Sequence, residues 1–75
     1  MKTSQEIFDM FVKNVKDFME EKNLSISGFA KFVQIPRRTV NGWITEGKIA
    51  RIDYVYQVAE CMGCSIDFLL GRVDF

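Results

Sequence analysis

Apolar residues recur along most of the chain with the three- and four-residue spacing of one helical face. The longest such stripe consists of Ile7, Phe8, Phe11, Val12, Val15, Phe18 and Met19. It predicts a helix over residues 4–22. Thr3 and Glu6 have the spacing of a capping box ahead of this helix, and Asn23 suits a left-handed stop after it.

A second and a third helix are predicted on either side of a tight connection at residues 34–35. Ser25 is the expected N-cap of the second helix, which runs to Val33. Pro36 suits the first turn of the third helix, where its missing N–H is not needed. We expect this third helix to end near Thr45, before a Glu-Gly pair.

Two further helices follow. An apolar stripe over residues 52–62 predicts the fourth helix, which Gly63 ends. Ser65 is the expected cap of a last short helix over residues 66–70, closed by Gly71. The fold class predicted is therefore all-α, with five short helices and no linker or repeat.

Residues 38–45 carry a competing signal for a β-hairpin. Asn41 and Gly42 form a strong hairpin turn pair and lie between β-branched and aromatic residues. A glycine inside a helix also costs about 1 kcal/mol relative to alanine. Because a lone two-stranded hairpin is marginal in water and the neighbouring segments are helical, we favour the helix.

Length and composition indicate one soluble globular domain over residues 1–75, since 48% of the residues are apolar and 27% are charged. Ten basic and ten acidic residues cancel, but they are unevenly placed. The net charge is −1 over residues 1–24, +4 over residues 25–51 and −3 over residues 52–75. This distribution suits a domain that presents one basic face to an anion, and a chance cluster on a solvated face is the alternative.

Several classes of chemistry are disfavoured. No apolar run approaches the roughly 20 residues that span a bilayer, and no secretory signal is evident, so we expect a cytoplasmic protein. The chain has no histidine, and a zinc site at Cys61 and Cys64 would need two more ligands. The βαβ context of a redox dithiol is also missing. We therefore expect buried free thiols, no metal, no cofactor and no enzymatic activity.

Residues 26–45 have the pattern of two helices that cross at a steep angle. Ala30 is small enough to let them approach, and Ile35, Val40 and Trp43 are spaced to fasten the second helix to the core. The spacing of Trp43 with Val40 predicts a buried tryptophan rather than an exposed one. The same arrangement leaves the polar side chains of the second helix facing outward.

Residues 58–71 carry a second pattern, in which an apolar helix, a glycine, a small apolar residue and a serine lead to a helix that finishes Leu-Leu-Gly. Together with the first motif, and with Trp43 followed by Gly47-Lys48-Ile49, this chain resembles the phage-repressor-like (Xre/Cro type) helix-turn-helix family. The resemblance covers about residues 5–71 and leaves 72–75 as a tail. It implies a compact five-helix, lambda-repressor-like DNA-binding domain that acts as a (pro)phage-type transcriptional repressor at an operator.

The resemblance also implies which residues contact double-stranded DNA. The second motif helix would lie in the major groove. Its base-contacting residues would be Arg37, Arg38 and Asn41, since arginine pairs with guanine and asparagine with adenine. The residues expected at phosphates or at a close approach of backbone to DNA are Lys31, Thr39, Gly42, Lys48 and Arg51. For each charged residue the alternative is a solvated surface group.

Four positions depart from the family pattern: Pro36 stands where serine is common, Gly28 stands where glutamate is frequent, and Gln34 and Ile26 are the other two. Gln34 stands where the turn usually has glycine, so a non-glycine residue must adopt a left-handed or otherwise uncommon conformation there. Ile26 stands where the family often has a glutamine that bonds a phosphate or a base, and isoleucine can do neither.

A single domain of this size contacts few base pairs, so the resemblance implies a homodimer on palindromic half-sites. The candidates for the dimer surface are Ile66, Leu70, Val73 and Phe75, whose apolar area is hard to place in a small core. The alternative function is a protein-interaction module of the same fold, such as an antitoxin or a regulatory subunit with weak DNA affinity. Association with the nucleoid of a prokaryote is the expected location.

Overall fold

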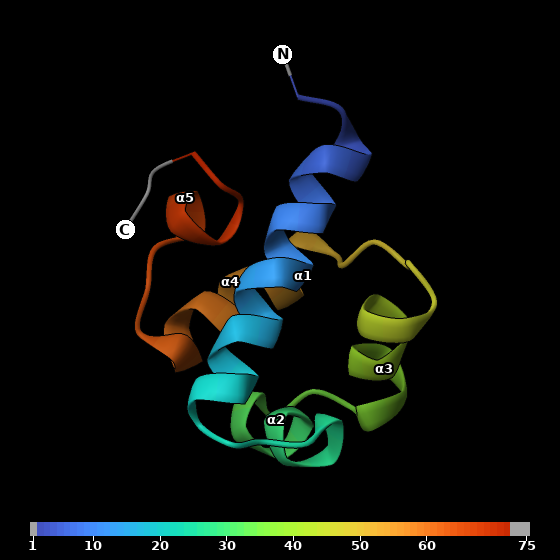
Figure 1. The fold of residues 1–75 in the computed structure, drawn as a ribbon, viewed down its shortest axis with the longest axis vertical. Coiled ribbons are helices and arrows are strands. Elements are labelled where there is room, and N and C mark those ends of the chain that lie inside the picture. Colours follow the sequence, from blue (N-terminus) through green and yellow to red (C-terminus); the bar gives the residue numbers. More distant parts are fainter. Residues whose placement is uncertain (1, 73–75) are drawn as a thin grey trace.

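The computed structural model describes residues 2–72 (Figure 1). Its elements are α1 (Ser4–Glu21), α2 (Ile26–Val33), α3 (Arg37–Thr45), α4 (Ile52–Met62) and α5 (Ile66–Leu69). No strand occurs among the described residues. The all-α prediction is confirmed, and so is the choice of a helix over a hairpin for residues 38–45.

Side-chain caps begin three of the helices at the predicted places. The Thr3 hydroxyl accepts a hydrogen bond from the N–H of Glu6 at 3.2 Å, and the Glu6 carboxylate accepts one from the N–H of Thr3 at 2.8 Å. These hydrogen bonds hold the pKa of Glu6 below its ordinary value, the one from the Thr3 backbone contributing most. Ser25 and Ser65 cap α2 and α5.

Three predicted boundaries differ from the structure by one residue. Helix α1 ends at Glu21 instead of Lys22, which is its C-cap. Pro36 is the N-cap of α3 rather than part of its first turn, because its ψ of 136° is extended. Its carbonyl oxygen accepts hydrogen bonds from the N–H groups of Thr39 at 3.0 Å and Val40 at 3.2 Å. The last helix ends at Leu69 instead of Leu70, because Gly71 adopts a left-handed φ of 82° and turns the chain away.

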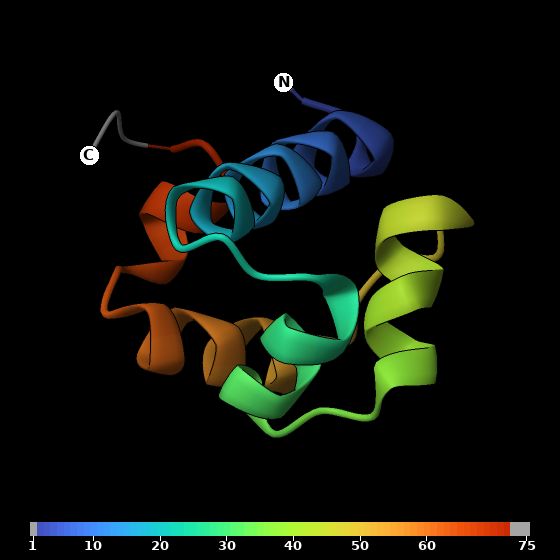
Figure 2. The same ribbon diagram turned by 60° about the horizontal axis from the view of Figure 1, so that its bottom comes forward.

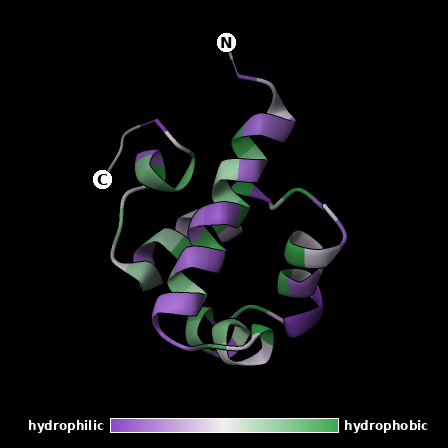
Figure 3. Ribbon diagram, viewed as in Figure 1, coloured by the Kyte–Doolittle hydropathy of each residue, from purple (hydrophilic) through white to green (hydrophobic). Residues whose placement is uncertain are grey.

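The long helix α1 runs through the middle of the molecule, with α3 and α5 on opposite sides of it (Figure 1). Helix α1 contacts both of them, while α2 packs against α3 and α4, and α4 also contacts α5. When the molecule is turned, α3 stands at its edge, joined to α2 by a short turn (Figure 2). Hydrophilic and hydrophobic residues alternate around α1, as expected for a helix with one buried face (Figure 3). No helix within residues 2–72 has the length and apolar character to cross a membrane.

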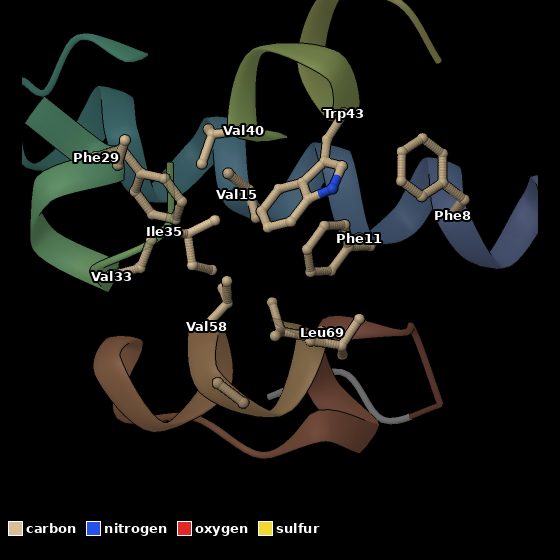
Figure 4. Packing of buried hydrophobic residues seen from close by; sticks show 13 residues of the cluster. Phe8, Phe11, Val15, Phe29, Val33, Ile35, Val40, Trp43, Val58 and Leu69 are labelled. Carbon is tan, nitrogen blue, oxygen red and sulfur yellow. The ribbon is translucent and has the colours of Figure 1, made fainter. Parts of the chain in front are cut away.

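The core is built around Trp43, which extends from α3 towards α1 and is 3% exposed (Figure 4). Its ring meets the ring of Phe11 edge to face, with 5.4 Å between centroids and an interplanar angle of 74°. Val58 of α4 and Leu69 of α5 close the core from the other side. The prediction of a buried Trp43 is confirmed, and this residue connects α3 to the longest helix.

Two of the predicted dimer residues lie at the edge of the core. Ile66 and Leu70 are partly buried against the core, so the monomer itself covers much of the apolar area assigned to a dimer surface. Asn14 holds this end in place, since its Nδ2 donates to the carbonyl oxygens of α5 at 3.1 and 3.2 Å. The other two dimer candidates, Val73 and Phe75, lie outside the described residues.

The cysteines are free thiols, as predicted, but they are only partly buried. Cys61 lies in the last turn of α4, and Cys64 follows Gly63 in the connection to α5. Each cysteine is partly exposed to solvent. Both pack against the edge of the core. Burial raises the pKa of the Cys64 thiol.

Candidate nucleic-acid interface

Helix α3 packs against the core with one face and exposes the residues of its first turn to solvent. Val40 and Trp43 are buried on the inner face, and Ile35 is buried just before the helix begins. Arg37 and Arg38 are exposed in the first turn. The predicted burial of Val40 and Trp43 and the predicted exposure of the two arginines are therefore confirmed, whereas Thr39 and Asn41 are half-buried.

The turn between α2 and α3 depends on two glutamines. Gln34 adopts φ 59° and ψ 44°, the left-handed conformation expected where a glycine is replaced. Gln57 of α4 donates from Nε2 to the carbonyl oxygens of Val33 at 2.6 Å and Gln34 at 3.1 Å. It thus satisfies carbonyls that α2 leaves free at its end. Sequence reasoning missed Gln57, and its only signal was a polar residue inside the apolar stripe of α4.

The N-terminal end of α3 is positively charged. The Nε of Arg37 donates to the Ser27 hydroxyl at 2.8 Å, which ties the first turn of α3 to the first turn of α2. No acidic residue and no side-chain cap occupies this end of α3. The free N–H groups of the first turn and the two arginines give this end a strong preference for anions.

A hollow of about 290 Å³ lies between α3, the α3–α4 connection and the start of α4. It brings together five of the residues predicted to contact DNA: Arg38, Thr39, Gly42, Lys48 and Arg51. The aromatic side chains of Trp43 and Tyr54 form part of its lining. We call it the basic hollow.

Two of the three cations of the basic hollow have partners. Arg51 forms a bidentate ion pair with Asp53, with Nε–Oδ1 at 3.1 Å and Nη2–Oδ2 at 2.5 Å. The pair lowers the pKa of Asp53 and raises that of Arg51, in each case chiefly through the side-chain hydrogen bond. The Arg51 guanidinium also lies 4.9 Å from the centre of the Tyr54 ring. Lys48 Nζ is 3.2 Å from Glu46 Oε1.

These ion pairs are exposed to solvent, so they contribute little to stability and either partner can exchange for another ion. Lys31 and Arg37 border a second hollow, at the turn between the two motif helices. Within residues 2–72 no carboxylate lies at ion-pair distance from Lys31, Arg37 or Arg38. These three cations are available to an anionic ligand.

Asn41 lines neither hollow. It is half-buried on α3, and its carbonyl oxygen accepts a hydrogen bond from the Thr45 hydroxyl at 2.9 Å.

The prediction for Gly42 needs a correction, because this residue does not face outward. It is buried, and a Cβ at this position would lie 3.2 Å from the Cδ of Lys48. The side chain of Lys48 therefore fills the space through which DNA was expected to approach the backbone.

Comparison with known protein families agrees with this geometry. The helix-turn-helix family model matches residues 15–69, from the middle of α1 to the end of α5. The chain belongs to this helix-turn-helix family, of the Xre/Cro type, and the predicted resemblance is confirmed. The family is one of DNA-binding transcription regulators. No curated protein and no solved structure matches the chain.

Proposed function

We propose that this protein is a sequence-specific transcriptional repressor of the (pro)phage type, which acts by occupying an operator. The observation that carries the proposal is the basic hollow, where Arg38, Lys48 and Arg51 meet beside the exposed face of α3. Three cations lie around one hollow next to α3, the second helix of the helix-turn-helix motif. This is the arrangement expected of a surface that contacts the phosphates of a DNA backbone. The action needs no catalytic group, since a bound protein blocks access to the operator.

The residues divide into two roles in this proposal. Arg38 and Asn41 contact base edges in the major groove, where arginine pairs with guanine and asparagine with adenine. Arg37 is held beside α2 by Ser27, and it contacts either a base or the adjoining phosphate. The remaining DNA contacts are to phosphates and come from Lys31, Thr39, Lys48 and Arg51. Residues 1–75 act as one DNA-binding domain in the cytoplasm, associated with the nucleoid of a prokaryote.

The exposed ion pairs of the basic hollow fit this role. When Arg51 and Lys48 approach DNA, a phosphate replaces the carboxylates of Asp53 and Glu46. Because these pairs are exposed, the exchange costs little. The carboxylates also limit the attraction of this surface for anions that do not fit the hollow.

A selection experiment tests the proposal. Random double-stranded DNA is incubated with the protein, bound fragments are sequenced, and the dissociation constant of the selected sequence is measured at several salt concentrations. We expect a preferred sequence and a slope of log affinity against log salt of roughly −3 to −4 per monomer, for about four neutralised phosphates. Lys16→Ala, on α1 outside both hollows, is the matched control and should leave the slope unchanged.

A flat salt response, or retention of all sequences alike, would contradict the proposal. That outcome would favour the alternative of a protein-interaction module with the same fold.

A further inference from the structure

An apolar groove of about 210 Å³ lies between the first half of α1, the α3–α4 connection and the start of α4. Of the nine described residues that line it, only Ser4 is polar. Phe8 and Val55, each 5% exposed, belong to its inner lining, whereas Ile49 and Ile52 are 60% and 69% exposed. The α3–α4 connection, which bears Ile49, runs back towards α1 in Figure 1. The groove therefore suits an apolar group and offers few hydrogen bonds to a polar one.

A second hollow, of about 290 Å³, adjoins the apolar groove near the two ends of the described chain. The groove and this hollow share Ile7 and Leu70 in their linings, so they are continuous. The other described residues that line it are Lys2 and Arg72, and we call it the terminal hollow. Together the two reach the roughly 300–1,000 Å³ of a typical small-molecule site, with an apolar part and a positively charged end.

The two cations of the terminal hollow are available to an anion. The Nζ of Lys2 donates to the carbonyl oxygen of Gly71 at 3.1 Å, which holds the ammonium group at this end of the groove. Within residues 2–72 no carboxylate lies at ion-pair distance from Lys2 or Arg72. The Glu6 carboxylate, whose charge interacts with that of Lys2, accepts its hydrogen bond from the N–H of Thr3 at 2.8 Å. An anionic group in the hollow would therefore meet two positive charges and no competing ion pair from this part of the chain.

We propose that the apolar groove and the terminal hollow form a binding site for a small carboxylic acid with an apolar body. The carboxylate meets the ammonium group of Lys2 and the guanidinium group of Arg72, whose paired N–H groups match the two carboxylate oxygens. The body lies in the groove, where it is removed from water. Because an engineered cavity of about 150 Å³ holds benzene, the groove has room for a body of about eight carbons.

The position of this site connects it to the proposed interface with DNA. Ile49 lines both the apolar groove and the basic hollow, and it follows Lys48 directly in the chain. A ligand in the groove therefore contacts the connection that carries a phosphate-binding residue, and we expect it to change the affinity for DNA. Binding of DNA should then change the affinity for the ligand by the same factor. This consequence rests on the proposed function, whereas the site itself does not.

Isothermal titration calorimetry with linear carboxylates, from butanoate to dodecanoate, tests the site. Octanoate should bind with a dissociation constant of about 0.05–2 mM, as expected for a small ligand in an open groove. The affinity should rise about three- to fourfold with each added methylene group, because each buries further apolar surface. It should level off beyond nonanoate, when the groove is full. Octyltrimethylammonium should bind at least about tenfold more weakly than octanoate, because the two cations repel it.

Variants separate the charged contact from the apolar one. Lys2→Gln and Arg72→Gln should each weaken octanoate binding about two- to fivefold, the size of an exposed ion pair, and leave binding of neutral octan-1-ol unchanged. Lys16→Gln, which removes a cation of α1 outside both parts of the site, is the matched control and should change neither. Ala50→Leu adds bulk to the lining of the groove and should weaken both probes about tenfold or more. Far-UV circular dichroism checks that each variant folds.

A wild-type protein that does not bind octanoate at about 5 mM would overturn the inference. Octanoate binding that neither Lys2→Gln nor Arg72→Gln weakens would overturn it too. Deletion of residues 73–75 should leave binding intact. If octanoate binds only the shortened chain, the tail is the occupant of the site and the inference is wrong.

Titration of octanoate with and without the selected DNA separates this inference from the proposed function. If octanoate binds but the protein selects no DNA, the proposed function fails and the site stands. If DNA is selected and the affinity for octanoate is the same in both titrations, the link through Ile49 is contradicted and the site stands.

Discussion

The side chain of Lys48 lies across Gly42 of α3. The N–H of Lys48 donates to the carbonyl oxygen of Gly42 at 3.1 Å, and its methylene groups cover the place where a Cβ would be. The glycine thus allows the α3–α4 connection to fold back closely over the helix. This contact holds the ammonium group of Lys48 at the edge of the basic hollow.

Gly42→Ala should make the protein more stable and its DNA binding weaker. Alanine favours the interior of a helix over glycine by up to about 1 kcal/mol. The new Cβ would lie 3.2 Å from the exposed and flexible side chain of Lys48, which can move by a few tenths of an ångström. Thermal unfolding and titration with the selected DNA measure the two effects. In a Lys48→Ala background the gain in stability should remain, while the added loss of affinity should disappear.

Gln34→Gly should stabilise the protein by about 1 kcal/mol, because glycine adopts the left-handed conformation without a Cβ penalty. The hydrogen bonds from Gln57 should survive, since one of them ends on the backbone of residue 34. Asn23→Gly is the matched control. Asn23 also has a positive φ, but asparagine tolerates this conformation better, so its gain should be smaller. Chemical denaturation of both variants provides the comparison, and an equal gain would contradict the strain assigned to Gln34.

The fold was largely predictable because local signals agreed with one another. The capping pair of Thr3 and Glu6, the stripe on α1 and the glycine at residue 63 each mark a helix end or face within a few residues. The hairpin signal at Asn41 and Gly42 was overridden by the burial of Val40 and Trp43, which requires helical spacing. Here tertiary packing decided between two local preferences.

Trp43→Ala should destabilise the protein by about 3–5 kcal/mol, because it removes the side chain at the centre of the core and the edge contact with Phe11. Since α3 is attached to α1 through this residue, sequence-specific binding should be lost as well. Phe32→Ala removes an aromatic side chain that is 43% exposed, and it should cost about 1 kcal/mol. Urea denaturation measures both, and a similar loss for the two variants would contradict the central role of Trp43.

The site was only partly predictable, because its details depend on contacts between distant residues. Nothing in the local sequence indicates that Gln57 donates a hydrogen bond to the end of α2. Nor does it indicate that the Ser27 hydroxyl accepts a hydrogen bond from Arg37. The covering of Gly42 by Lys48 depends on how the connection after α3 folds back. The distribution of charge and the faces of the helices could be predicted from the sequence. The partners of individual side chains could be identified only from the three-dimensional structure.

Cys64 should make stability depend on alkaline pH. Burial raises the pKa of its thiol in the folded protein, so the unfolded chain ionises first as the pH rises past the ordinary value of 9.0. The neutral thiol therefore makes its full contribution to the free energy of unfolding below that pH, and this contribution declines above it. The Cys64→Ala substitution itself should lower the free energy of unfolding by about 1 kcal/mol. Between about pH 8 and pH 10.5 the free energy of unfolding of this variant should decline less than that of the wild type. Parallel curves for the two proteins would contradict this effect, and a chelator should leave both melting temperatures unchanged.

In the proposed complex, α3 selects the DNA sequence while the connection after it binds the backbone. The most direct measurement compares binding selection from random DNA for the wild type, Arg38→Ala and Lys48→Ala. Arg38→Ala should lose the preference at one operator position, at a cost of about 1–3 kcal/mol for sequences that carry that base. Lys48→Ala should keep every preference, bind all sequences more weakly and lower the salt slope by about one. If Arg38→Ala weakens operator and random DNA equally, Arg38 contacts only phosphate, and the placement of α3 in the major groove is contradicted.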